Sequence, residues 1–132
     1  MLSLNDIINS LETIRNQFSN IGVDARIYYK IDLRQQHNRL ATGHEFEDTL
    51  STQSIINAIR YSARSQETAD NLIEWLQQGG MVFTKHDCSS RDYGIDITFH
   101  SQPIDVKETL GRFGVRPKTY YIEIWASIDV NG

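Results

Sequence analysis

Two acidic residues and a lysine in the second half of the chain have a spacing that would suit metal-dependent phosphodiester hydrolysis. Asp96 follows Gly94-Ile95, and Asp105 and Lys107 form an acid-x-Lys pair shortly after it. Paired carboxylates can hold a divalent metal ion, which activates a water for attack. Such a site needs the second acid and the lysine on a strand beside the first, whereas Pro103 interrupts this short interval. We therefore interpret Asp96 as a solvent-facing strand residue and predict no catalytic residue here.

A second group of possible metal ligands consists of His86, Cys88 and His100. The His-x-Cys spacing places two side chains on one side of an extended chain, and His100 would face them across a predicted hairpin. A fourth ligand would have to come from Asp87 or Asp92. We favour a turn histidine and a half-buried cysteine as the interpretation, and we predict neither a metal nor another cofactor.

Motifs for nucleophilic or phosphate chemistry do not occur in the sequence. It has no Gly-x-Ser-x-Gly elbow, no glycine-rich phosphate loop and no cysteine motif with a recognised histidine partner. Many hydrolytic sites have no motif of this kind, so an enzyme stays an open alternative. The sequence favours a non-enzymatic protein that acts by binding another macromolecule.

A basic cluster precedes the last predicted strand. Its charges are Arg112, Arg116 and Lys118, and no acid occurs between Thr109 and Ile122. Phe113 adjoins the first arginine, and glycine and proline supply turn chemistry. Such a cluster is typical of a contact with a carboxylate-rich or phosphate-bearing partner, and the alternative is a solvated turn. We predict that the three charges and Phe113 bind a partner.

The last predicted strand has bulky side chains on both faces. Tyr121 and Trp125 would share one face. The other face would carry Tyr120, Ile122, Ile124, Ala126 and Ile128. If helices cover only one face of the sheet, the face with Tyr121 and Trp125 needs another cover, which a partner or a second copy would provide. Tyr121 and Trp125 are therefore also predicted to bind a partner.

Helical periodicity predicts two helices, and a third segment is ambiguous. Ser3 and Asp6 form a capping box at the start of a helix that ends near Gly22. Ser65 is the predicted N-cap of a helix that ends before Gly79-Gly80. Residues 51–64 suit either a helix face or a period-two strand, and we favour the helix.

Alternation of apolar and polar residues predicts strands over 25–33, 81–85, 94–100 and 119–130. Residues 34–48 are predicted as a long loop or hairpin tip, and residues 104–113 as a loop with a short helical turn. A polar turn with Asp87, Ser89, Ser90 and Asp92 would join 81–85 to 94–100. This order of elements predicts one α+β domain over residues 1–132, with an antiparallel or mixed sheet and helices packed on one face.

Composition and charge exclude several classes of protein. The charged fraction of 23% and the hydrophobic fraction of 39% lie near globular averages and argue against disorder. The apolar runs are far shorter than the roughly 20 residues that a bilayer requires, so we expect no membrane partner. A net charge of −4 disfavours nucleic acid as a partner. The lone Cys88 and the lack of a secretory signal predict a cytoplasmic location.

One stretch of the chain supports a resemblance to a known family. The segment from Ser65 through Trp75-Leu76 to Gly79 precedes a strand, a turn with Arg91-Asp92, and later extended strands. With the opening helix that leads into a strand and the long strand near the C-terminus, this order resembles the tail-terminator or neck proteins of tailed bacteriophages. The sequence departs from that family by having no Pro-bearing strand soon after its first strand, and the family would have residues 51–64 extended.

The resemblance implies a structural protein without cofactor, in a virion or the host cytoplasm, that closes into a homomeric ring. Sheet edges and long loops would form the subunit contacts, so we predict self-association. One alternative is a small acidic inhibitor, such as a phage anti-defence or toxin-immunity protein, that binds a protein target. A third class is the metal-dependent nuclease suggested by Asp96, Asp105 and Lys107.

Overall fold

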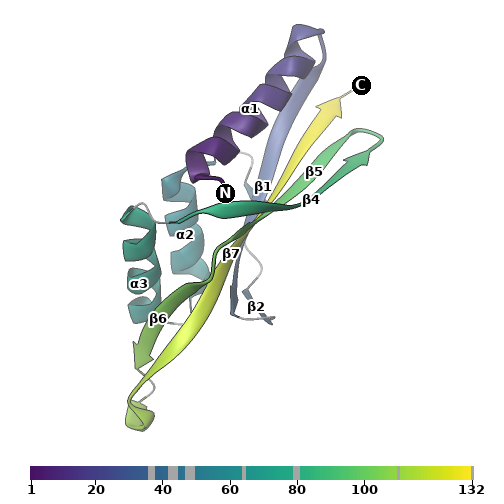
Figure 1. Cartoon of the computed structure of the whole chain (residues 1–132). Helices are drawn as coiled ribbons and strands as arrows, with labels where there is room; N and C mark the ends of the chain where they lie inside the picture. Colours follow the sequence, from purple (N-terminus) through teal and green to yellow (C-terminus); the bar gives the residue numbers. More distant parts are fainter. Residues whose placement is uncertain are drawn as a thin grey trace.

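The protein has an α+β fold in which helices pack on one face of an antiparallel sheet (Figure 1). The computed structural model describes residues 1–35, 38–41, 45–46, 50–63, 65–78, 81–109 and 111–131. The α-helices in these ranges are α1 (Leu4–Asn20), α2 (Thr52–Ser62) and α3 (Gln66–Gln77). This architecture confirms the predicted fold class. None of the described helices is long and apolar enough to span a bilayer.

The strands lie in the order β2-β1-β7-β5-β4, with β3 beside β1 and β6 beside β7. All of these pairs are antiparallel. The long strand β7 is central, because β1 pairs along one of its edges and β6 and then β5 pair along the other. The bounds are β1 (Asp24–Gln35), β2 (Asn38–Ala41), β3 (Glu45–Phe46), β4 (Phe83–Arg91), β5 (Gly94–Ser101), β6 (Ile104–Thr109), the 3-10 turn η1 (Gly111–Phe113) and β7 (Val115–Asn131).

The helices begin at the predicted capping residues. Ser3 Oγ accepts a hydrogen bond from the Asp6 backbone at 3.1 Å, and Asp6 Oδ2 accepts one from the Ser3 backbone at 2.9 Å. The bond from the Ser3 backbone is the main cause of a lowered pKa at Asp6. Ser51 and Ser65 cap α2 and α3 through their hydroxyls. The ambiguous segment 51–64 is thus helical over Thr52–Ser62, as favoured from the sequence.

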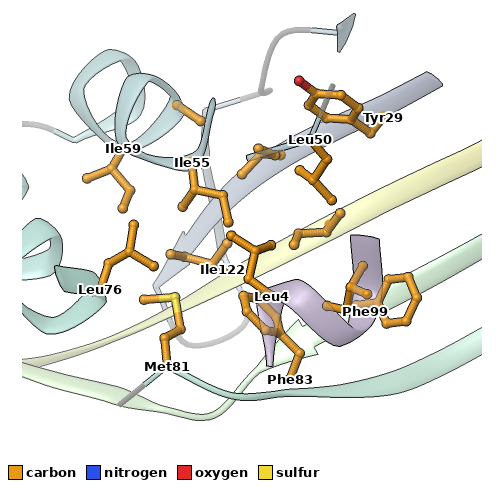
Figure 2. Packing of buried hydrophobic residues seen from close by; sticks show 14 of the residues in the cluster. Leu4, Tyr29, Leu50, Ile55, Ile59, Leu76, Met81, Phe83, Phe99 and Ile122 are labelled. Atoms are coloured by element: carbon orange, nitrogen blue, oxygen red, sulfur yellow. The ribbon is translucent and has the colours of Figure 1, made fainter. Parts of the chain in front are cut away.

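One apolar core lies between the helices and the sheet, on what we call the helix side; the opposite face is the far side. Figure 2 shows side chains from α1, α2, α3 and β7 that converge in this core. Ile55 of α2, Phe83 of β4 and Ile122 of β7 are completely buried there. Tyr29 of β1 also faces the helices, because its hydroxyl lies 3.0 Å from Ser54 Oγ of α2. Burial of this one face of the sheet explains the period-two pattern of β1 and β7.

Strands occur in two segments that were predicted as a long loop or hairpin tip (34–48) and as a loop with a short helical turn (104–113), and the antiparallel pairing of Gln35 with Asn38 agrees with the hairpin alternative. In 34–48, β1 continues to Gln35 and the short strands β2 and β3 pair with it, while the rest of the segment lies outside the described residues. In 104–113, the chain forms β6 before the predicted short helical turn at η1. Ile104 and Val106 of β6 are buried while Asp105 and Lys107 are exposed. Two apolar residues beside α3 suffice for a strand, which is a weaker signal than a long alternating run.

The β4–β5 hairpin confirms the predicted pairing but has a shorter turn. Only Asp92 and Tyr93 separate the two strands, so Asp87, Ser89 and Ser90 belong to β4 and not to the turn. Their polarity is compatible with a strand because all three residues are exposed. The same composition that suits a turn therefore suits an exposed edge strand.

Candidate interaction surfaces

The carboxylates of the suggested nuclease site are far apart. Asp96 pairs with Ser127 and Asp105 pairs with Thr119, both on β7. These two partners on β7 are eight residues apart, so the two acids are separated by about 26 Å along the strand direction. Each acid also has a neighbour of its own, since Asp96 accepts from Ser127 Oγ at 2.6 Å and Asp105 accepts from Thr119 Oγ1 at 2.7 Å. Asp96, Asp105 and Lys107 therefore cannot bind one metal ion.

The second suggested metal site is split between the two faces of the hairpin. His86 stacks on His100, with ring centroids 4.2 Å apart and 10° between the ring planes. A β-bulge around His86 changes the alternation of β4, and Cys88 pairs with Ile97 on the helix side. Within the described ranges no group of three His, Cys, Asp or Glu residues is arranged to hold a metal ion.

A buried carboxylate on the far side joins three strands. Glu123 of β7 is 2% exposed, and its Oε2 accepts from Arg34 Nη1 at 2.7 Å and from His100 Nε2 at 2.8 Å. Burial is the main cause of a lowered pKa at His100; Glu123 opposes this effect, whereas His86 and Arg34 add to it. His100 is therefore mainly neutral near pH 7 and donates its Nε2–H to Glu123. The group links β1, β7 and β5 across the sheet.

Sequence reasoning missed this group because alternation puts Glu123 on the same face as Tyr121 and Trp125, which was expected to lack a helix cover. A carboxylate between two isoleucines in the strongest strand was the available signal. A histidine held by a carboxylate can serve as a general base. The recorded contacts of His100, however, are with Glu123 and His86, and no described hydroxyl or thiol bonds to it. The geometry supports an electrostatic link between strands and supplies no nucleophile.

The predicted basic cluster lies on the hairpin formed by β6, η1 and β7, which projects beyond α3 (Figure 1). Phe113 is 63% exposed, and the Arg112 guanidinium lies 5.5 Å from the centre of its ring. Arg116 is also exposed and Lys118 is half-buried. We call these four residues the basic tip.

The remaining predicted contact residues, Tyr121 and Trp125, lie on the opposite face of the sheet from Lys118. Lys118 is opposite Val106, which is buried on the helix side. Three residues later, Tyr121 lies on the far side, and so does Trp125, which is 42% exposed. The six residues predicted to bind a partner therefore form two surfaces, the basic tip and an aromatic pair on the far side.

The free edge of β6 is covered by side chains of α3. Asn71 Nδ2 donates to the backbone carbonyl of Lys107 at 3.1 Å. Glu67 Oε2 accepts from the backbone N–H of Thr109 at 3.2 Å, and Glu67 Oε1 accepts from the hydroxyl of Thr109 at 3.0 Å. Beside this contact lies a groove of about 470 Å³, whose lining includes Glu74 and Trp75. These hydrogen bonds occupy backbone groups that would otherwise be available for another strand.

The outer edge of β4 has no comparable cover. Among the described residues, Leu2 and Phe83 exchange backbone hydrogen bonds of 2.7 Å at the start of this edge, and farther along the Cys88 N–H donates to the side chain of its neighbour Asp87 at 2.8 Å. Every β4 residue after Phe83 is exposed. Arg91 anchors the turn end of the hairpin by ion pairs with Asp96 (2.9 Å) and Asp129, and the bond to Asp129 is the main cause of a raised pKa at Arg91. The hairpin is thus held in place while its outer edge stays accessible.

Comparison with protein-family models finds no matching family, and comparisons with curated proteins and with solved structures likewise find no match.

Proposed function

We propose that this protein is a non-enzymatic structural subunit that assembles with copies of itself into a homomeric ring, as its resemblance to tail-terminator or neck proteins of tailed phages implies. The observation that carries the proposal is β4, an edge strand whose side chains are exposed on both faces. Proteins usually shorten, block or pair such an edge because it attracts other strands. A partner strand from another copy would remove this exposure.

The two surfaces that contain the predicted contact residues add to this argument. Trp125 and Tyr121 lie on the far side of the sheet, and Phe113 is exposed on the basic tip. Aromatic residues and arginines are enriched in protein interfaces. We propose that the aromatic pair and the basic tip are contact sites for neighbouring subunits.

The helical conformation of α2 is a departure from the resemblance. The family would have an extended segment where Thr52–Ser62 forms a helix. The resemblance therefore rests on the opening helix and strand, on α3, and on the long final strand. The open edge of β4 supports self-assembly independently of α2.

The first test is the mass of the protein in solution. Multi-angle light scattering at micromolar concentration should give a mass several times the 15.2 kDa of one chain. Electron microscopy of that species would distinguish a closed ring from an open filament. A monomer at these concentrations would contradict the ring and favour the small acidic inhibitor, which would bind one protein target.

The second test removes the charges of the basic tip. Replacing Arg112, Arg116 and Lys118 by serine should weaken association in a salt-dependent way, because their charges lie at the surface and are screened by ions. The melting temperature should change little, since exposed charges contribute little to stability. The control is Arg15→Ser with Arg60→Ser, which removes helix-surface charges outside the proposed contacts. If the triple variant unfolds, the charges stabilise the subunit and are not an interface.

A further inference from the structure

We infer that the outer edge of β4 pairs with the start of β1, residues 24–28, in a neighbouring copy, so that one sheet continues from subunit to subunit. This inference rests on the proposed self-assembly and names its contact. Residues 24–28 pair with β7 on one edge, and no described strand pairs with their other edge. Among the described residues, each copy therefore has two strand edges without a partner strand, β4 and the start of β1, at opposite sides of the sheet.

Strand direction allows the two edges to join. The sheet runs β1-β7-β5-β4 with every neighbouring pair antiparallel, so β1 and β4 point in opposite directions. When two copies with the same orientation stand side by side, β4 of one is antiparallel to β1 of the next. The contact uses different surfaces on the two copies, and such a contact repeats until a ring closes.

The backbone groups of β4 that point outward follow from its hydrogen bonds. Phe83 uses its N–H and its C=O to bind Leu2, so Phe83 points away from β5. Its partner on β5 is Ser101, whose backbone groups must then point toward β7. Alternation along β5 turns Asp96 and Thr98 toward β4, where they face Ser89 and Asp87. Cys88, which lies between these two β4 residues, and Ser90, which follows, therefore present their backbone groups to the outside. The outward N–H of Cys88 donates to Asp87 Oδ1 at 2.8 Å, a bond at the surface that a neighbouring strand would replace.

The outward groups of β1 follow in the same way. Val130 of β7 donates its backbone N–H to Tyr93 at 2.7 Å, on the β5 side. Alternation then turns Asp129 and Ser127 toward β1, where they face Arg26 and Tyr28. Ala25 and Ile27 consequently present their N–H and C=O groups at the outer edge.

The side chains of the paired residues must also lie on the same face of the continued sheet, and they do. Residues paired across antiparallel strands have their side chains on the same face. Cys88 is opposite Ile97 and is on the helix side, and Ser90 follows it two residues later. Ala25 is 6% exposed beneath the helices, and Ile27 packs against the same core. Pairing Ser90 with Ala25 and Cys88 with Ile27 forms about four backbone hydrogen bonds, of which one replaces the bond from Cys88 to Asp87, and keeps the helices of both copies on one side.

Charge complementarity supports this register. On the far side it places Arg91 opposite Asp24 of the neighbour and Ser89 opposite Arg26, with Asp87 diagonal to that arginine. A shift of two residues in one direction puts Arg91 opposite Arg26, which is repulsive. A shift in the other direction leaves Arg91 with no residue of the neighbouring strand opposite it and loses its pair with Asp24.

Disulfide trapping tests the contact directly. Arg26→Cys and Ser89→Cys, on a Cys88→Ser background, place two cysteines at a non-hydrogen-bonded pair, where the Cα atoms lie about 4.5 Å apart. Mild oxidation should produce a ladder of covalent oligomers on a non-reducing gel. Ser89→Cys alone on the same background should stay uncrosslinked. A dimer from this single variant would show β4 pairing with itself about a two-fold axis and would overturn the inference.

Hydrogen exchange of the unaltered protein gives a second measurement that does not depend on how the variants fold. The amides of Ser90, Ala25 and Ile27 should be protected in the assembly and exchange at least tenfold faster after dilution to monomers. An assembly with no ladder and no such protection would contradict this contact while leaving the proposed self-assembly intact. A protein that is monomeric throughout would contradict both.

Discussion

The two edge strands β6 and β4 end the same sheet in opposite ways. On β6, α3 supplies Asn71 and Glu67 to the outward backbone groups of Lys107 and Thr109. On β4, the described contacts beyond β5 are the bridge of Phe83 with Leu2 at the start of the strand and the exposed bond from the Cys88 N–H to the Asp87 side chain. Each of the two is the first strand of a hairpin, β6–β7 or β4–β5, so pairing within a hairpin does not explain the difference. The position of α3 over β6 does, because a helix can cover one edge of this sheet and not both.

This comparison indicates where a partner would bind. An edge whose polar groups are already bonded gains little from another strand, whereas an open edge gains several hydrogen bonds without new strain. Glu108 strengthens the β6 side further, because its Oε1 accepts from Thr68 at 2.5 Å and also from the Tyr120 hydroxyl. The β6 edge is thus already occupied by side chains of its own subunit, and β4 is available for assembly.

The largest expected difference concerns packing. Leu72 of α3 is completely buried, so Leu72→Ala should lower the free energy of unfolding by about 2–5 kcal/mol. Cys88 of β4 is exposed, and Cys88→Ala should change the free energy of unfolding by less than about 0.5 kcal/mol. Urea unfolding of the dissociated protein measures both. Equal losses would mean that β4 is packed as firmly as α3, and the comparison would fail.

A smaller effect should follow from uncovering β6. Asn71→Ala and Glu67→Ala leave the Lys107 carbonyl and the Thr109 N–H without their side-chain partners, and each should cost about 1 kcal/mol. Both variants should also aggregate more readily, since a second strand edge becomes accessible. Glu74→Ala is the matched control on the same helix, because Glu74 is exposed and bonds to Gln78 one turn later. If the control aggregates equally, loss of helix charge and not an open edge is the cause.

The smallest effect concerns the link at the base of the β4–β5 hairpin. Because the pKa of His100 is lowered on folding, the unfolded chain binds more protons below the usual histidine pKa of about 6.5. Stability should therefore decrease as the pH falls through that value, and His100→Gln should reduce this slope. Glu123, Arg34 and His86 face the ring and must be left unchanged in the comparison. Urea unfolding at pH 7.5 and 5.5 measures this change in stability with pH. If His100 were not responsible, the variant would lose as much stability between the two pH values as the unaltered protein does.

Local patterns in the chain were enough to predict most of the elements. Serine caps and helical periodicity located α1 and α3, and alternation located β1, β5 and β7. Caps act within one helical turn, and alternation reflects a single buried face, so both signals lie in a few neighbouring residues. The α+β class and the one-sided packing of helices followed from the order of these elements.

The contacts between distant segments were not available from such patterns. Glu123 is buried because Arg34 and His100, from two other strands, reach it. A bulge in β4 separates Cys88 from His86, and strand alternation separates Lys118 from Tyr121. Each of these outcomes depends on the register between strands that are far apart in the chain, and a shift of one residue would exchange the two faces. Residue types and short-range spacing therefore established which elements form, while long-range pairing established which side chains meet and which edge stays open.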